Sequence, residues 1–513
     1  MEERPLSVLF SGTGGDRVRR AGETLMKAFG RCGLRAWGRS RRRDEDGVSR
    51  FLIAAAPEPG TMLPAPVVSA DIDSSTLSSG GRTHPLPYER LTGKIEDTPT
   101  LLAGAAAGMF ALDAAACWAA DETGAAGHAY AAANFPATGA VSAASARTPS
   151  PSAASGAATG AAPAAQFHGG ELYVLNGGSA AAAGAVAAGC RCVVATRPSP
   201  ALERLARSDL GLSLDRVDDG DTAVLRAAGA GFAGARALAL IDEPGLRRAE
   251  ATLRWAARAE IPLVVCVIDA GETALVHALS HDDKTAPYAV LAPTSVEELY
   301  HGMSEAFATA ERCQCPVTVL VDRLLNERWE TRQRPIEAKS ADRGAWGVAN
   351  SGSFDRYAVT ESGVSARAVP GQERLLFTLS ARVRTKKLER KYNTLRAELL
   401  RVPVAPPGTG ETLILTWGGA YPAVRWAAET LHGTGGPRIH AVPVRVPAPL
   451  QDLAQYAAWR KAARIVVVES TAGRPLSRWL RTAAGIEAAA TAQVDRPYDA
   501  QRTLRALQEA LDV

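Results

Sequence analysis

A glycine-rich loop after the first apolar segment is the first feature of the sequence that could bind a ligand. It reads Gly12-Thr13-Gly14-Gly15 and lies between an expected strand, Ser7–Phe10, and an expected helix, Arg19–Cys32. Backbone N–H groups at the start of a helix can hold a phosphate. However, Arg17 replaces the last glycine of a GxGxxG fingerprint, and Asp16 adds a negative charge where an anion would lie. A nucleotide site and a tight structural turn both remain open, and the pattern favours the turn.

Histidines and cysteines are the other residue types that could bind a metal. His277 and His281 are spaced to share a helical face and precede two aspartates, but the glutamate of an HExxH site is missing, which favours a surface loop. No cysteine pair has CxxC spacing, and the Cys-x-Cys pairs stand in apolar segments where thiols act as small hydrophobic groups. We therefore expect reduced thiols, no metal site and no iron–sulfur cluster on this chain. The seven cysteines are Cys32, Cys117, Cys190, Cys192, Cys266, Cys313 and Cys315.

Length and charge indicate how many domains the chain has and which kinds of partner are not expected. At about 150 residues per domain, 513 residues predict roughly three domains. The 58 basic and 54 acidic side chains leave a formal net charge of +4, too small to indicate a nucleic-acid or membrane partner. No run of about 18 apolar residues predicts a membrane span, and the N-terminus lacks the pattern of a signal peptide. We therefore expect a cytoplasmic protein.

Composition and periodicity divide the chain into five parts. Residues 1–133 open with a strand, the glycine loop, a helix and another strand, which is the order of a βαβ unit. Residues 134–168 are rich in Ala, Ser, Gly and Pro, which predicts a flexible linker. Strand and helix patterns alternate over 169–335 and predict a doubly wound parallel sheet with helices on both faces. A charged connecting segment, 336–410, leads to a smaller α/β domain at 411–513.

Three elements of the middle part have especially clear patterns. Pro262–Ile268 is rich in β-branched residues, as expected for a strand that is buried on both faces. Val317–Val321 has the same character, and Val296–Glu311 has the period of an amphipathic helix. The last part shows strand patterns at Leu413–Thr416 and Ile465–Glu469. The α/β class follows from this alternation.

Many short motifs, in a constant order, carry a resemblance to a known family. The opening loop GTGGDR is similar to the GxGGQG loop of the gamma domain of 2-oxoacid:ferredoxin oxidoreductases. The later motifs resemble the alpha domain of 2-oxoglutarate ferredoxin oxidoreductase, so the whole looks like a fused gamma and alpha subunit. These motifs are Gly231-Phe232-Ala233-Gly234-Ala235-Arg236-Ala237, Glu260-Ile261-Pro262-Leu263-Val264-Val265, Leu291-Ala292-Pro293-Thr294-Ser295, Asn326-Glu327-Arg328-Trp329-Glu330-Thr331, Glu361-Ser362-Gly363-Val364-Ser365 and Trp417-Gly418.

The resemblance implies three domains and a reaction. The domains would be a gamma domain, a thiamine-diphosphate pyrimidine-type domain built on the parallel sheet, and a transketolase-C-like domain. Enzymes of this family oxidatively decarboxylate a 2-oxoacid on thiamine diphosphate, reduce ferredoxin and form an acyl-CoA from coenzyme A. The resemblance further implies a hetero-oligomer, in which a separate beta subunit carries the Mg²⁺–diphosphate loop and the iron–sulfur cluster. In agreement, this chain has no GDG motif followed by paired asparagines and no cluster-type cysteine set.

The same resemblance points to Asp218 as the catalytic and cofactor-binding carboxylate. Counting back from Phe232 places Asp218 where the family has a glutamate that contacts the cofactor's aminopyrimidine and promotes its active tautomer. Aspartate is one methylene shorter, which reduces its reach by roughly 1 Å, whereas such a contact tolerates about 0.5 Å. As an alternative, Asp218 and Asp219 are only a helix N-cap and first-turn charges, and both interpretations remain open.

Two further segments correspond to the family's substrate and cofactor loops. Ser199 falls on a threonine of the substrate loop, where its hydroxyl would donate to the substrate carboxylate; alternatively, Ser199 with Pro200 simply begins a helix. Gly245 ends the counterpart of the family's TSGPG turn and would approach the cofactor. The family's substrate-binding arginine is replaced by Asp269, which would repel a carboxylate. The resemblance therefore leaves two functions open. One is an active subunit with an altered substrate, recognised through Arg197 or Arg191, and the other is a degenerate scaffold that binds a beta-type partner without thiamine diphosphate.

Overall fold

The computed structural model divides the chain into two compact units, each described by itself. The N-terminal unit comprises Met1–Asn176 and Glu327–Ile336, and the C-terminal unit comprises Gly177–Asn326 and Glu337–Val513. The structure describes residues 6–32, 34–41, 47–56, 68–73, 76–79, 82–85, 98–110, 118, 122–134, 172–208, 211–271, 274–275, 284–333, 361, 381–399, 411–433, 438–449, 459, 461–469, 474–483, 485–494 and 500–511. The expected linker at 134–168 lies almost entirely outside these residues.

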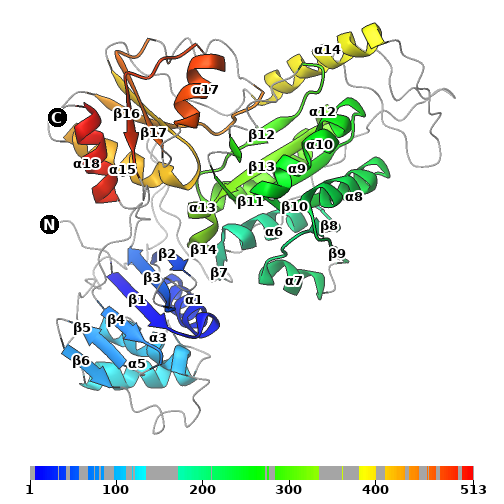
Figure 1. The fold of residues 1–513 in the computed structure, drawn as a ribbon. Helices are drawn as coiled ribbons and strands as arrows, with labels where there is room; N and C mark the ends of the chain where they lie inside the picture. Colours follow the sequence, from blue (N-terminus) through cyan, green and yellow to red (C-terminus); the bar gives the residue numbers. More distant parts are fainter. Residues whose placement is uncertain are drawn as a thin grey trace, which may run out of the picture. The chain divides into compact units, whose positions relative to one another are not determined.

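The described strands of the N-terminal unit form a mixed sheet in the order β6-β5-β4-β1-β3-β2-β14-β7. The predicted strand–helix–strand order is confirmed, and β3 lies antiparallel between β1 and β2. Figure 1 shows this sheet with its helices. The elements are β1 (Leu6–Gly12), α1 (Gly15–Arg31), β2 (Arg35–Arg41), β3 (Ser49–Ala56), β4 (Val68–Asp71), β5 (Thr76–Ser79), β6 (Arg82–Pro85), α3 (Thr98–Met109), α5 (Glu122–Asn134), β7 (Leu172–Asn176) and β14 (Arg328–Gln333).

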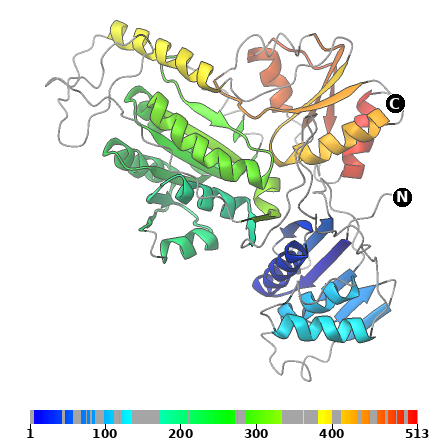
Figure 2. The same ribbon diagram turned by 180° about the vertical axis from the view of Figure 1, so that it is seen from behind.

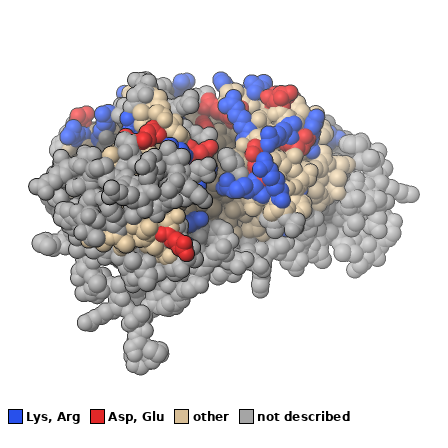
Figure 3. Space-filling model, turned by 90° about the horizontal axis from the view of Figure 1, so that it is seen from below, with Lys and Arg blue, Asp and Glu red and all other residues tan. Residues whose placement is uncertain are grey.

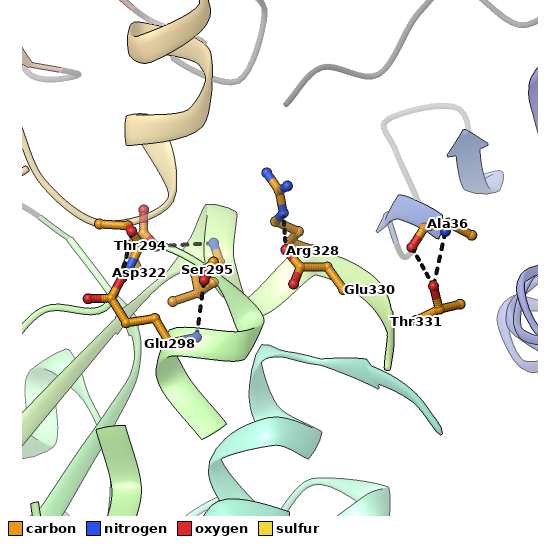
Figure 4. A network of polar contacts seen from close by, with 9 residues as sticks. Ala36, Thr294, Ser295, Glu298, Asp322, Arg328, Glu330 and Thr331 are labelled. Atoms are coloured by element: carbon orange, nitrogen blue, oxygen red, sulfur yellow. Dashed lines mark hydrogen bonds and ion pairs between the residues drawn. The ribbon is translucent and has the colours of Figure 1, made fainter. Parts of the chain in front are cut away.

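Two strands of this sheet come from the part of the sequence that we assigned to the middle domain. β14 pairs antiparallel with both β2 and β7. Its Thr331 hydroxyl accepts a hydrogen bond from the Ala36 N–H at 3.0 Å and donates to the Ala36 carbonyl oxygen at 3.2 Å (Figure 4). Arg39 adds an ion pair with Glu327 at 2.6 Å. The expected boundaries at 169 and 335 stay predictions, and the structure assigns the ends of that segment to the N-terminal unit.

The C-terminal unit contains the predicted parallel sheet, in the order β12-β13-β11-β10-β8-β9. All of its pairings are parallel, which confirms the doubly wound class. The elements are α6 (Gly177–Ala187), β8 (Cys192–Ala195), α7 (Pro200–Ala206), β9 (Ser213–Arg216), α8 (Gly220–Phe232), β10 (Ala237–Asp242), α9 (Glu243–Arg248), α10 (Glu250–Arg258), β11 (Leu263–Ala270), β12 (Ala289–Leu291), α12 (Val296–Cys313), β13 (Pro316–Asp322) and α13 (Arg323–Glu327).

Strand order determines which face each helix covers. The connections β9–α8–β10 and β10–α10–β11 move along the sheet in one direction, so right-handed crossovers place α8 and α10 on the same face. The connections through α7 and α12 move in the opposite direction and place those helices on the other face, where α12 packs against α6. The strands β11 and β13 are almost wholly buried, as their β-branched runs predicted.

A second parallel sheet of the C-terminal unit, in the order β16-β15-β17-β18, lies in the part of the chain expected to form a smaller α/β domain, and the domain boundary at 411 stays a prediction. One hydrophobic core includes Val265 and Leu320 of the first sheet, Leu415 of the second, and Trp417, which follows β15. The elements are β15 (Thr412–Thr416), the 3-10 helix η3 (Gly418–Ala420), α15 (Tyr421–Gly433), β16 (Ile439–Pro443), β17 (Arg464–Glu469), α17 (Pro475–Ala483), β18 (Ala490–Gln493) and α18 (Ala500–Leu511).

A buried carboxylate connects these two sheets. Asp322, at the end of β13, accepts hydrogen bonds from the N–H groups of Leu325 and Gly419 at 3.0 Å each. Gly418 has a left-handed φ of 59°, and a Cβ there would lie 2.9 Å from the Asp322 carboxyl carbon. Position 418 therefore needs glycine for both backbone conformation and space.

The charged connecting segment contains the helix α14 (Ala381–Leu399), which lies alongside α12 (Figures 1 and 2). Two of its lysines are fully buried. Lys387 Nζ lies 2.6 Å from a carboxylate oxygen of Glu260, and Lys391 Nζ lies 3.1 Å from the same oxygen. Lys391 also donates to the Gln314 carbonyl oxygen at 3.3 Å. The helix is thus attached by buried charge as well as by Leu388 and Leu395.

Charge on the surface is locally uneven although the net charge is small. On the face seen from below, Lys and Arg side chains gather on one part of the described surface, with Asp and Glu side chains beside them (Figure 3). Within the described residues, no helix is long and apolar enough to cross a membrane.

Candidate functional site

The start of α8 separates the roles of the two neighbouring aspartates. Asp219 is the N-cap: its carboxylate accepts a 2.9 Å hydrogen bond from the Thr222 N–H and a 2.6 Å bond from the Thr222 hydroxyl. These bonds, with the side-chain bond contributing most, lower the pKa of Asp219. Asp218 is exposed and makes no hydrogen bond or ion pair with the described part of the chain. The capping role belongs to Asp219, and the catalytic role of Asp218 stays a prediction.

A close contact between two glycines positions this helix start. A Cβ at Gly220 would lie 2.3 Å from the Cα of Gly245, so α8 and α9 meet backbone to backbone. The Gly245 N–H donates to the Asp242 carboxylate at 2.9 Å, which caps α9. Gly245 therefore has a packing role, and its contact with a cofactor stays a prediction.

Substitution of Gly220 by alanine tests this contact. We expect the free energy of unfolding to fall by about 1–3 kcal/mol, because backbone atoms of Gly245 must move to admit the methyl group. Gly229→Ala in the same helix is the matched control: nothing lies within 4 Å of its added Cβ, and it should stabilise by up to about 1 kcal/mol. Urea denaturation of both variants would measure the difference, and equal effects would contradict the contact.

Carboxylates gather where β10 and β11 end. Glu243 accepts a hydrogen bond from the Gly271 N–H at 3.0 Å, so it bridges the two strand ends. Asp269 adopts a left-handed φ of 56° and accepts a 2.8 Å bond from the Asn326 side-chain amide. Ligands of open α/β sheets bind at the carboxyl ends of strands. This part of the edge would repel an anionic substrate.

The carboxyl end of β8 supplies a cation and a hydroxyl instead. Ser199 caps α7 by accepting a hydrogen bond from the Leu202 N–H at 3.2 Å, with proline next to it, which confirms the capping interpretation. Its substrate contact stays a prediction. Arg197 is exposed and makes no hydrogen bond or ion pair within the described residues. Arg191 stands at the opposite end of β8 and donates to the carbonyl oxygens of Val186 and Cys190. Of the two arginines, only Arg197 lies at the ligand-binding edge.

The first turn of α12 is held by hydrogen bonds between residues that are close together in the sequence. The Ser295 hydroxyl accepts from the Glu298 N–H at 3.1 Å, and Glu298 accepts from the Thr294 N–H and hydroxyl at 2.9 and 2.6 Å (Figure 4). Glu298 also pairs with Arg445 of the last domain at 2.9 Å. The serine bond is that of a capping box, whereas Glu298 bonds to Thr294, one residue before the cap, and has a second, tertiary partner.

The carboxylate of Asp73 binds the glycine-rich loop of the N-terminal unit. Asp73 accepts a 2.5 Å hydrogen bond from the Thr13 N–H and lies 3.6 Å from Arg17. It stands where a phosphate would bind at the start of α1. This arrangement supports the tight-turn interpretation over the nucleotide site.

Potential metal ligands do not cluster in the described residues, and most of the free thiols are buried. No group of three potential ligands gathers there, and His277, His281, Asp282 and Asp283 lie outside them. Burial raises the pKa of the thiols of Cys190, Cys266 and Cys313 to about 12. The expectation of fully reduced thiols was wrong at Cys32, which is disulfide-bonded, while Cys117 lies outside the described residues. The free cysteines are Cys190, Cys192, Cys266, Cys313 and Cys315.

Comparisons with known proteins show which proteins this chain is similar to. Residues 214–345 match the family described as "Pyruvate flavodoxin/ferredoxin oxidoreductase, thiamine diP-bdg". The 2-oxoglutarate synthase subunit KorA of Archaeoglobus fulgidus is 27% identical over 326 residues, which cover 59% of this chain and 89% of that protein. The ketoisovalerate oxidoreductase subunit VorB of Methanothermobacter thermautotrophicus is 28% identical over 183 residues, or 32% of this chain and 51% of that protein.

A third relative and a solved structure extend the comparison. The alpha subunit of 2-oxoacid:ferredoxin oxidoreductase 2 of Aeropyrum pernix is 28% identical over 193 residues, and the match spans 30% of its length. The 2-oxoglutarate:ferredoxin oxidoreductase of Magnetococcus marinus, solved with 2-oxoglutarate, coenzyme A and succinyl-CoA bound, has a TM-score of 0.77 at 18% identity. That likeness covers 99% of this chain and 100% of the other, and it shows the fold. Residues 214–345 thus match the thiamine-diphosphate-binding model of pyruvate flavodoxin/ferredoxin oxidoreductases, and the chain is similar to the alpha-type subunits of 2-oxoacid:ferredoxin oxidoreductases.

Proposed function

We propose that this chain is the fused gamma–alpha subunit of a 2-oxoacid:ferredoxin oxidoreductase complex. The complex would oxidatively decarboxylate a 2-oxoacid, pass the electrons to ferredoxin and form an acyl-CoA. One observation carries the proposal: within the family-matched segment, Asp218 presents an exposed carboxylate without a partner among the described residues, at the start of α8. The proposal assigns the Mg²⁺–diphosphate loop and the iron–sulfur cluster to a separate beta subunit, because their sequence motifs are missing here.

The residues at the start of α8 fit the aminopyrimidine end of thiamine diphosphate. When bound, this cofactor supplies the carbon that attacks the 2-oxo group and accepts the electron pair released with carbon dioxide. Asp218 would accept a hydrogen bond from the pyrimidine ring, since its carboxylate has no other partner in the described chain. Asp219, fixed by Thr222, would hold the helix start in place, and the contact between Gly220 and Gly245 would hold α8 against α9.

Arg197 is the residue that we assign to the substrate carboxylate. It replaces, from the end of β8, the positive charge that the family has at the position of Asp269. Arg197→Ala should raise KM for the 2-oxoacid by about 10- to 100-fold, the effect of losing one charge-assisted hydrogen bond. The value of kcat should change much less, because the bond is present in both ground and transition states.

The control for this prediction is Arg191→Ala, which changes the same residue type at the opposite end of β8. Its KM should equal that of the wild type in steady-state kinetics of the complex. An unchanged KM in Arg197→Ala would remove Arg197 from the substrate site.

A second candidate function is a scaffold that binds the beta-type partner without thiamine diphosphate. The carboxylates of Asp242, Glu243 and Asp269 at the ends of β10 and β11 favour it, since they place negative charge near an anionic substrate. Isothermal calorimetry with thiamine diphosphate and Mg²⁺ on the co-expressed complex distinguishes the two. Saturable binding, followed by dye reduction with a 2-oxoacid and coenzyme A, supports the enzyme. A complex that assembles but binds no cofactor supports the scaffold.

A further inference from the structure

The outer surface of α8 and α10 carries two large apolar side chains that the chain itself does not cover. Leu225 is 51% exposed and Trp255 is 50% exposed. The remaining exposed large hydrophobic residue among those that the structure describes is Val383 on α14, at 36%. Isolated exposed apolar side chains are common, whereas a contiguous apolar surface indicates an interaction site.

Leu225 and Trp255 lie at the same level of two neighbouring helices. The Thr252 hydroxyl of α10 donates a 2.5 Å hydrogen bond to Asp221 of α8, which sets the two helices side by side. Both helices cover one face of the sheet and run in the same direction, because each connects parallel strands. Leu225 follows Asp221 by four residues and Trp255 follows Thr252 by three, so each lies one turn further along its helix. The two side chains therefore lie at matching positions on the outer surface of this helix pair.

Arginines surround this surface. Arg247 and Arg248 lie at the end of α9, just before α10, and Arg258 lies three residues after Trp255. All three are exposed, and none makes a hydrogen bond or an ion pair within the part of the chain that the structure describes. Arg248 is close enough to Asp219 to contribute to the lowered pKa of that carboxyl group. Glu250 of α10 is paired with Arg254 at 3.5 Å, so the surface has an apolar centre and a rim in which positive charge is in excess.

The same surface lies close to Asp218, the residue predicted to bind the cofactor. Asp218 immediately precedes α8, and Leu225 lies two turns further along it. A protein that covered Leu225 and Trp255 would also extend toward Asp218. We propose that the surface formed by Leu225, Trp255, Arg247, Arg248 and Arg258 is the docking site of the beta-type subunit. The occupant would present carboxylates around an apolar pocket for the Trp255 indole.

This inference rests on the proposed function, because it places the partner subunit that the function requires. A second copy of this chain is a poor occupant, since two positive rims would face each other. Tryptophan and arginine are also the residue types that most often dominate the binding energy of interfaces between different proteins.

The experiment measures binding between this chain and the beta-type subunit of its own organism, each purified separately, by isothermal calorimetry. Trp255→Asp should raise Kd by at least about 30-fold, the effect expected of an anchor residue at the centre of an interface. Arg258→Glu should also weaken binding and reduce its salt dependence, because the lost charge would face carboxylates. Val383→Asp is the matched control, which introduces the same charge at an exposed apolar position of α14 and should leave Kd unchanged.

The outcomes separate the docking site from the function. If the wild-type chain binds the beta-type subunit and Trp255→Asp binds equally well, the docking site is overturned and the proposed function stands. If Trp255→Asp and Val383→Asp weaken binding to the same degree, the effect is not specific to this surface and the docking site is again overturned. Failure of the wild-type chain to bind the beta-type subunit would overturn both proposals.

Discussion

Replacing Asp218 by alanine should reduce the rate of 2-oxoacid-dependent dye reduction by the complex by about a hundredfold to a thousandfold, the loss typical of a missing electrostatic group in an active site. The reason is the separation of roles at the start of α8. Asp219 forms the N-cap with Thr222, so Asp218 has no structural duty within the described chain and its removal should not unfold the helix. The measurement is steady-state dye reduction, with circular dichroism to verify folding.

The neighbouring residue supplies the control. Asp219→Ala should lower stability by about 0.5–2 kcal/mol, the usual effect of a lost N-cap, while leaving much of the activity. An Asp218→Ala complex with wild-type activity would show that this carboxylate has no catalytic role. Asp218→Glu is informative in a different way: a gain in rate would show that the shorter side chain reaches the cofactor poorly, since the resemblance implies a glutamate at this position.

Replacing Glu260 by glutamine should lower the free energy of unfolding by about 3–5 kcal/mol, because it leaves buried ammonium groups without their counter-charge. Glu260 and both lysines are buried, and Lys387 contacts both carboxylate oxygens, at 2.6 and 2.7 Å. Glutamine preserves the shape, so the change isolates the charge. Glu389→Gln on the exposed side of α14 is the matched control and should change stability by less than about 0.5 kcal/mol.

The pH dependence of stability gives a second measurement at the same place. Burial lowers the pKa of Lys391 below its usual 10.5, and the charge of Glu260 partly opposes this. Between the lowered value and 10.5, the unfolded chain binds a proton that the folded chain has lost, so stability from this group rises as pH rises through that window. Lys391→Met should remove this increase. Urea denaturation at several alkaline pH values would test it, and an unchanged slope would contradict the assignment.

Local patterns in the sequence determined most of the secondary structure. The β-branched runs became β11 and β13, buried on both faces, and the amphipathic pattern at Val296 became α12 with its capping serine. Ser199 before Pro200 became the cap of α7. These features depend on side chains within a few residues of each other, which is why periodicity and capping rules predict them. The α/β class and the parallel sheet followed from the same local signals.

Only the tertiary structure decided the features that depend on distant partners. β14 joins the N-terminal sheet through residues almost three hundred positions earlier in the chain, which no local period encodes. The basic α14 has the sequence of a solvated helix, yet Lys387 and Lys391 are buried because Glu260 lies opposite them. Asp73 fills the glycine loop from a strand end about sixty residues away. Of two adjacent aspartates, one caps α8 and the other faces solvent, because backbone geometry at a helix start directs one carboxylate to the free N–H groups.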